Sequence, residues 1–226
     1  MQETFYLDRL YPFQEEVLHT IEVLGLEFYL TGGTALSRCY TDHRYSDDLD
    51  FFVNDCGGFK KQCKIAINGL KKKWTCEVAT TSDSFVRIFA QKQDITLKVD
   101  FVNDVSVHFG KIQKSKIFNR VDSWRNILSN KLCALSRQEA KDIADIIFIA
   151  KTYHFEWRIL VSEAKEKDLW VDPLEICKII KQFPVHLLES IKWIKKIEID
   201  ELKKQIDVLH DDIFIGSKNS LVNCKL

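Results

Sequence analysis

A chain of 226 residues with 46% hydrophobic and 29% charged residues is typical of an ordinary globular protein of one domain or two small ones. Its 33 basic and 33 acidic residues cancel, with 16 of each up to Arg120 and 17 of each beyond it, so composition does not indicate general nucleic-acid binding. No window approaches the ~18 apolar residues that span a bilayer and the N-terminus has no signal-peptide pattern, so we expect a cytoplasmic protein with no membrane partner.

The cysteines support a reducing compartment. There are seven, an odd number, and they are scattered without a Cys-x-x-Cys pair. This pattern predicts reduced thiols, not a disulfide framework or a zinc site.

The first half of the chain predicts an α/β (α+β) domain. Apolar residues recur at helical spacing after Pro12, and Gly25 suits the left-handed stop of that helix. In chain order we expect a helix at 12–24, a strand at 27–31, a short helix at 34–40, a strand at 49–53, a helix at 59–73, and strands at 74–80, 85–91 and 95–102, the last two forming a hairpin.

Beyond residue 121 the pattern predicts helices alone. We expect one from Asp122 or Ser123 through Asn130, which residues 131–135 either continue or restart. Others are expected at 138–153, 155–168, 173–182, 185–196 and 199–209. A loose boundary between Gly110 and Asp122 divides the chain into a core with a mixed β-sheet, residues 1–115, and a helical bundle, residues 116–226.

Two aspartates beside the strand at 49–53 indicate a metal site. Asp48 and Asp50 point to the same face of an extended backbone, while Leu49 points into the core. Like charges so close favour a cation between them, here Mg²⁺ or Mn²⁺. Asp100 shares a strand face with Lys98, and if the two strands are neighbours the three carboxylates converge. The alternative for each motif alone is a solvated strand end or face.

Three carboxylates around hard cations suit phosphoryl and nucleotidyl transfer, in which the cations activate a hydroxyl and offset charge on the triphosphate. Gly32 and Gly33 would let backbone N–H groups approach phosphates, and Thr34 adds a hydroxyl. Asp100 is also a candidate general base. A Gly-Gly pair by itself is more often just a turn.

The helix at 59–73 carries six lysines on one face: Lys60, Lys61, Lys64, Lys71, Lys72 and Lys73. The simpler interpretation is a solvated helix face. The alternative is a surface that contacts the phosphates of a polynucleotide.

Four segments together resemble the AbiEii/AbiGii toxin family of the nucleotidyltransferase superfamily. They are TGGTAL at 31–36, HRYSDDLDFF at 43–52, LKVDFV at 97–102 and NKLCALSRQEAKDIADI at 130–146. The resemblance, which covers about residues 25–150, implies a polymerase-β-like core, a divalent metal and a nucleoside triphosphate (NTP) donor. Members of this family are commonly toxins of bacterial type IV toxin–antitoxin pairs, and some relatives add nucleotides to tRNA ends.

The resemblance also implies roles for individual residues. Its first two motifs fall on Gly32, Gly33, Asp48, Asp50, Lys98 and Asp100. Its helical motifs imply nucleotide binding by Lys131, Arg137 and Asp145, with Asp142 as the runner-up for the last position. His43 and Arg44 belong to the pattern as well, and Arg44 is expected either to pair with Asp47 or Asp48 or to contact phosphate.

Helical geometry agrees with part of this assignment. At about 100° per residue in an unbroken helix, Asp142 and Asp145 lie within roughly 40° of Lys131. Arg137 lies about 120° away, unless the helix breaks near Ser136, where Ser136 and Glu139 match a capping box. Lys131 would then meet the triphosphate, while Asp145 orients a lysine or the base.

These observations predict a metal-dependent nucleotidyltransferase that transfers a nucleoside monophosphate (NMP) from an NTP to an RNA, such as tRNA, or to a protein hydroxyl. By resemblance it would act as a toxin with a cognate antitoxin. The alternatives are a phosphotransferase on the same site and a non-catalytic NTP-binding module.

Overall fold

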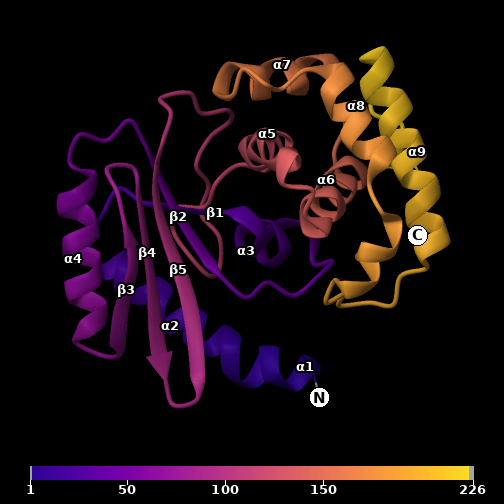
Figure 1. Cartoon of the computed structure of the whole chain (residues 1–226). Coiled ribbons are helices and arrows are strands. Elements are labelled where there is room, and N and C mark those ends of the chain that lie inside the picture. The colour runs from indigo at the N-terminus through magenta and orange to yellow at the C-terminus, as the bar shows by residue number, and fades with distance from the viewer. Residues whose placement is uncertain (1, 224–226) are drawn as a thin grey trace. The chain divides into compact units, whose positions relative to one another are not determined.

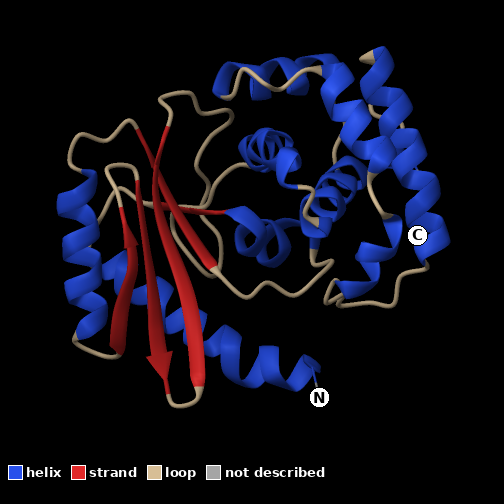
Figure 2. Cartoon of the chain, in the orientation of Figure 1, coloured by secondary structure: helices blue, strands red, loops and turns tan. Residues whose placement is uncertain are grey.

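The computed structural model describes residues 2–223, and its contacts divide the chain into two compact units. The first unit comprises the chain up to Tyr40 together with Tyr45–Ser123, and the second comprises Thr41–Arg44 and the chain from Trp124 onward. Figure 1 traces the chain from indigo to yellow, and Figure 2 colours the strands, all of which fall in the first unit within the described residues.

The first unit is built on a five-stranded mixed sheet with the order β1-β2-β5-β4-β3. Only β2 and β5 pair in parallel, and the other neighbours are antiparallel. The strands are β1 (Tyr29–Thr31), β2 (Leu49–Asn54), β3 (Thr75–Thr81), β4 (Phe85–Lys92) and β5 (Ile95–Asp104). The expected α/β class with a mixed sheet is confirmed, as is the hairpin between β4 and β5.

The helices of this unit follow the predicted pattern. The longest at the N-terminus, α2 (Tyr11–Val23), has Pro12 in its first turn and ends before Gly25, whose φ is +63°. Two short segments precede it directly, α1 (Gln2–Phe5) and a π-helix (Tyr6–Leu10). After β1 the chain forms α3 (Gly32–Leu36) and a second π-helix (Ser37–Thr41), so this helix starts two residues earlier than expected.

Alternation along the strands gives the sheet one apolar and one polar face. In β2 the side chains of Leu49, Phe51 and Val53 are buried. The ring of Phe51 stacks on Phe101 of β5 at 5.5 Å, and Phe28 lies 4.9 Å from Phe101. This aromatic cluster anchors the core on one side, which leaves the intervening aspartates on the opposite face.

The lysine-rich helix α4 (Phe59–Lys71) packs by its apolar side. Phe59, Cys63 and Leu70 are buried, and Phe59 meets Phe28 with ring centroids 6.3 Å apart. The lysines of this helix are exposed. Figure 1 shows α4 beside β3, at the end of the sheet opposite β1.

The first unit continues past residue 115, where the sequence placed the end of the core. The backbone of Leu30 accepts a hydrogen bond from Asp122 N at 2.9 Å and donates one to Arg120 O at 2.8 Å. Val121 is buried between these contacts. Backbone pairing with β1 thus includes residues 120–122 in the core.

The second unit is helical among its described residues, in agreement with the expectation from the sequence. Its helices are α5 (Trp124–Ala134), α6 (Ala140–Thr152), α7 (Trp157–Lys167), α8 (Pro173–Gln182) and α9 (Ile199–Ile215), with 3₁₀ turns at Leu135–Arg137, Val185–Ser190 and Leu221–Asn223. Asp172 caps α8 by accepting a hydrogen bond from Leu174 N, and Pro173 occupies its first turn.

Two helical expectations in this unit are wrong. The predicted helix at 185–196 is only the 3₁₀ turn Val185–Ser190, because Ile194 N donates to the His43 carbonyl in an extended pairing. The capping box at Ser136 and Glu139 does not form. Glu139, not Ser136, is the N-cap residue of α6, and its side chain makes no capping hydrogen bond. The helical path is nevertheless broken there, with Gln138 at φ +53°.

The thiols agree with the expectation of reduced cysteines. The six cysteines in the described part of the chain are free, and Cys224 lies outside it. Among residues 2–223, no helix is both long and apolar enough to cross a membrane.

Candidate active site

The register of the sheet brings the predicted acids together. β2 and β5 run parallel, and Asp50 and Asp100 are directly opposed Cα partners on the polar face. Asp48 directly precedes β2, and Lys98 lies two residues before Asp100 on the same face of β5. The condition set by the sequence, that these strands be neighbours, is met.

Lys98 binds the first aspartate. Its Nζ lies 2.5 Å from Asp48 Oδ2. Partial burial works against its positive charge, but the hydrogen bond to Asp48 and the charges of Asp48, Asp100 and Asp50 together raise the pKa of Lys98. The positive charge of this one ammonium group is therefore stabilised by all three carboxylates.

The third aspartate is held by Arg87, a residue that the sequence analysis missed. Arg87 on β4 is the Cα partner of Asp100. Its Nε and Nη2 donate to the two carboxylate oxygens at 2.8 and 2.7 Å, a bidentate pair. This hydrogen bond to Asp100 is the main cause that raises the pKa of Arg87.

The sequence did contain a signal for Arg87. The hairpin loop consists of Gln93 and Asp94 alone, because Lys92 pairs with Ile95. A two-residue loop sets the register of the whole hairpin, which places residue 87 opposite residue 100. The expected strand end at Gln91 left a three-residue loop and obscured this pairing.

Gly32 is required by the position of Asp50. Its φ is +67°, and a Cβ built at this position would overlap the Asp50 carboxylate. No other residue type fits both the backbone conformation and the space. Gly33 follows, buried, in the first turn of α3.

Thr34 supports the loop that carries Asp48. Its side chain is fully buried, and its hydroxyl hydrogen-bonds the backbone carbonyl of Asp48 and, at 2.9 Å, the hydroxyl of Ser46. In this arrangement the Thr34 hydroxyl is engaged in hydrogen bonds within the protein.

The chemistry of these groups fits a divalent cation in part. Three carboxylates offer the hard oxygen ligands that Mg²⁺ and Mn²⁺ prefer. Within the described residues, however, no three acidic, His or Cys side chains are arranged to coordinate one ion. Lys98 and Arg87 bind two of the carboxylates instead. Asp48, Asp50 and Asp100 would therefore hold a metal after these ion pairs rearrange.

A second polar cluster lies in the helical unit and contains the remaining predicted residues. Lys131 of α5 binds two aspartates of α6, with Nζ 2.7 Å from Asp142 Oδ1 and 2.6 Å from Asp145 Oδ2. Arg137 Nη2 lies 3.0 Å from Asp142 Oδ2. More than half of the Arg137 side chain is exposed, whereas both aspartates are fully buried.

His43 and Arg44 join this cluster. Arg44 contacts both oxygens of Asp145 at 2.7 Å, and His43 Nε2 lies 2.9 Å from Asp145 Oδ1. The other imidazole nitrogen lies 2.7 Å from the Thr41 hydroxyl, and the ring stacks on Phe148. Asp145 is thus the centre of a buried ionic network formed with His43, Arg44 and Lys131.

Electrostatics keep this network charged. Burial opposes ionisation of Asp145, but Arg44, Lys131 and His43 outweigh it and hold the pKa of that carboxyl well below its usual range. Burial likewise opposes the charge of Lys131, yet Asp145 and Asp142 raise its pKa. For His43 burial dominates, so its pKa is lowered and the imidazole is neutral at pH 7.

Comparison with known proteins places the chain among nucleotidyltransferases. The family described as "Nucleotidyl transferase AbiEii toxin, Type IV TA system" matches residues 18–211, most of the chain. The chain belongs to this family, and the resemblance noted from four sequence segments is confirmed. Membership implies a nucleotide substrate and a cognate antitoxin.

Solved structures show the same fold. One is described as "putative nucleotidyltransferase from H. pylori", with 22% identity and a TM-score of 0.59 over 89% of this chain and 93% of the other. Another is JHP933 from Helicobacter pylori, with 23% identity and a TM-score of 0.58 over 89% and 90% of the two chains. The comparison with curated proteins found no match.

Proposed function

We propose that this nucleotidyltransferase transfers NMP from an NTP to a hydroxyl of an RNA, with tRNA as the first acceptor to test. The observation that carries the proposal is the register that opposes Asp50 and Asp100 on the polar face, with Asp48 one residue before β2. In this proposal Asp48, Asp50 and Asp100 hold Mg²⁺ or Mn²⁺. When bound, such a cation acidifies the attacking hydroxyl and offsets charge on the leaving pyrophosphate.

The residues of the sheet have distinct proposed roles. Asp100 accepts the proton of the incoming hydroxyl once Arg87 has released one of its oxygens. Lys98 offsets the negative charge of Asp48. The backbone N–H groups of Gly32 and Gly33 bind phosphate, and Thr34 acts by holding the carbonyl of Asp48.

The helical cluster is proposed to bind nucleotide through its exposed member. Arg137 keeps more than half of its side chain exposed and has donors to spare beyond its bond to Asp142. Lys131 and Asp145 are buried and would position Asp142 and the helix ends that support Arg137. We propose that the enzyme acts in the cytoplasm, where NTPs occur and where its free thiols stay reduced.

The test is incubation of the protein with each α-³²P-labelled NTP, Mg²⁺ or Mn²⁺ and total bacterial RNA. Asp48→Asn and Asp50→Asn remove charge with little change of shape, and the exposed Asp83→Asn serves as a matched control from the same unit. We expect label on a tRNA-sized band, reduced about 100-fold or more by either site variant and unchanged by the control. Pyrophosphate, not nucleoside diphosphate, is the expected product.

Other outcomes identify the rivals. Label on protein alone would indicate protein nucleotidylation, and release of nucleoside diphosphate would indicate a phosphotransferase. NTP binding without label on any acceptor would favour a non-catalytic binding module. That last alternative has one observation in its favour, because internal cations already bind two of the three carboxylates.

A further inference from the structure

We propose that the outer edge of β3 and the hollow between β3 and α4 bind an extended segment of a partner protein, one apolar residue flanked by acidic residues. This surface lies on the apolar side of the sheet, away from the polar face that carries the aspartates. The proposal is independent of the catalytic function.

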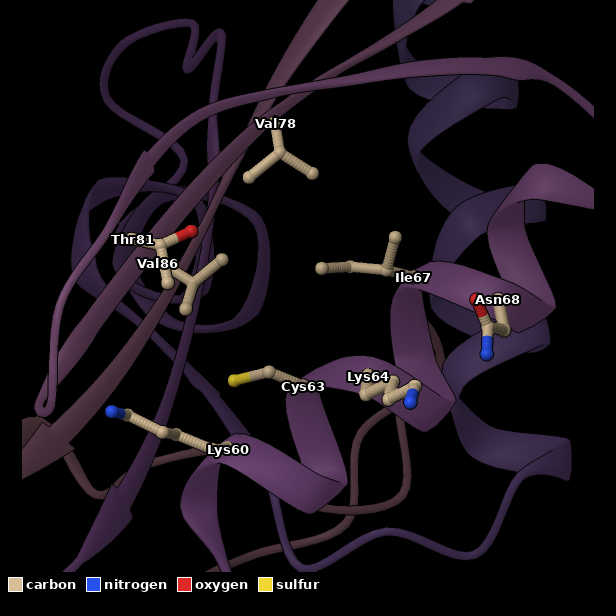
Figure 3. Close-up of a pocket in the computed structure, with 8 residues that line it drawn as sticks. All are labelled: Lys60, Cys63, Lys64, Ile67, Asn68, Val78, Thr81 and Val86. Carbon is tan, nitrogen blue, oxygen red and sulfur yellow. The ribbon is translucent and has the colours of Figure 1, made fainter.

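The hollow is apolar and small. Cys63 and Ile67 point from α4 toward Val78 of β3 and Val86 of β4 across it (Figure 3). Burial raises the pKa of the Cys63 thiol to about 12, so the thiol is uncharged at physiological pH and forms part of the apolar lining. The cavity measures about 220 Å³, less than the roughly 300–1,000 Å³ of small-molecule sites, so it suits a single side chain.

A β-bulge shapes this hollow. The register between β3 and β4 shifts between Val78 and Thr80. Val78 and Thr81 are three residues apart and would face opposite sides of a regular strand, but the extra residue returns Thr81 to the side of Val78. Both therefore line the same cavity.

The edge of β3 is open to another strand. It is the last strand of the sheet and, among the described residues, pairs only with β4. Almost every residue of its sequence, TCEVATT, is exposed, and the strand has a single charge at Glu77 and no proline. Such an edge presents unpaired backbone groups that an added strand can bond.

The charge beside this edge selects an acidic partner. From Phe59 to Lys73 there are six lysines and no acidic residue. Lys60 and Lys64 lie one turn apart and line the hollow, and Lys60 also forms an ion pair with the exposed Asp83. Acidic residues on either side of an apolar anchor would meet these lysines.

A second copy of the chain fits less well. Antiparallel pairing of two β3 edges requires a two-fold axis perpendicular to the sheet, which would place both α4 helices on the same face. Their lysines would then approach one another and repel. RNA would use the lysines, but it would leave the apolar hollow and the open strand edge without a role.

The experiment is selection from a displayed library of random nine-residue peptides on the immobilised full-length protein. We expect enrichment of sequences with acidic residues around one apolar residue. A selected peptide, made synthetically and labelled, should bind in fluorescence anisotropy about tenfold or more weakly to Lys60→Glu/Lys64→Glu. The matched control, Lys71→Glu/Lys72→Glu, changes the same charge at the C-terminal end of α4, outside the hollow, and should bind as the unaltered protein does.

Two further probes test the pairing mode. Prolines at alternate positions of the selected peptide remove its backbone donors and should abolish binding, whereas replacing the apolar anchor by serine should weaken it strongly. Circular dichroism verifies that the exposed-site variants remain folded. The proposal would be overturned by a selection without enrichment, or by peptide binding that is unchanged in Lys60→Glu/Lys64→Glu. The proposal would also fail if no peptide bound and Lys60→Glu/Lys64→Glu instead lost binding to total RNA. It would fail as well if the protein formed concentration-dependent dimers and this double variant were monomeric.

Discussion

Pairing of acids with bases decides how single residues of the site behave. Asp48, Asp50 and Asp100 carry three negative charges, and Lys98 and Arg87 supply two positive ones. A divalent cation therefore competes with side chains of the protein itself. Metal affinity at this site should depend on Arg87 as much as on the acids.

Arg87→Ala tests that competition. Without its guanidinium partner, the nearly buried Asp100 carboxylate is expected to destabilise the metal-free protein by about 1–3 kcal/mol. Mg²⁺ or Mn²⁺ should restore the stability, because the cation then binds the Asp100 carboxylate without competition from Arg87. Thermal unfolding with and without the cation measures the effect. Arg125→Ala, which breaks the Arg125–Glu163 pair in the helical unit, should lose stability without rescue; equal rescue of both variants would contradict the prediction.

Gly32→Ala tests the close approach to Asp50. The added methyl group would strain the backbone at φ +67° and overlap the Asp50 carboxylate, so transfer should fall by about 100-fold as Asp50 is displaced. Gly25→Ala has a matching φ of +63° but nothing within 4 Å of the new Cβ. It should lose about 1 kcal/mol of stability and keep its activity. Similar activity in the two variants would show that Asp50 needs no such space.

One buried carboxylate links helices α5 and α6. Asp145 contacts Lys131 across the two helices and also Arg44, a residue 101 positions earlier in the chain. The short segment Thr41–Arg44 is thereby tied to the helical unit. A buried ionic network of this kind fixes one arrangement and is costly to break on one side only.

His43 should make the stability of this network depend on pH. Its pKa is lowered from 6.5, chiefly by burial, so the unfolded chain binds a proton at a higher pH than the folded protein does. The stabilising contribution is complete above pH 6.5 and is lost as the pH falls toward the lowered value, with a slope of at most about 1.4 kcal/mol per pH unit. Urea unfolding at several pH values from neutral to mildly acidic measures it. His43→Gln should flatten the profile, while the exposed His19→Gln should leave it unchanged.

At the scale of the whole molecule, each of the two units has a buried core. The first is built on the aromatic cluster of the sheet and the second on the apolar sides of its helices. Each core contains a buried cysteine, Cys63 in α4 and Cys177 in α8. Burial raises the pKa of these thiols to about 12 and about 11, so both react slowly until the surrounding structure opens.

Asp145→Asn should open the helical unit first. The substitution leaves Lys131 and Arg44 buried without their shared carboxylate, at a cost of about 3–5 kcal/mol. Thiol labelling followed by peptide mass spectrometry should show a larger acceleration at Cys177 than at Cys63. Asp168→Asn, an exposed change in the same unit, is the control. Equal acceleration at both cysteines would indicate that the units open together.

Much of the local structure was predictable from the sequence. Helical spacing and Gly25 located α2, and period-two alternation located β2, β4 and β5 and the face that carries Asp50 and Asp100. These features depend on side chains close together in the chain, so a short window contains the information. The expected helix at 185–196 failed because a distant segment, at His43, pairs with its second half.

Which residues meet across the fold was a matter for the tertiary structure. The sequence alone determined the mixed α/β class, the acidic motifs and the family. It could not place β2 beside β5, since two strands lie between them in the chain and the choice depends on burying whole apolar faces. Nor could the sequence decide whether Lys131 and Asp145 share one helix, because α5 ends at Ala134 and the two residues meet by packing of α5 on α6. Long-range contacts of this kind are set by the summed burial of many side chains, which no local pattern records.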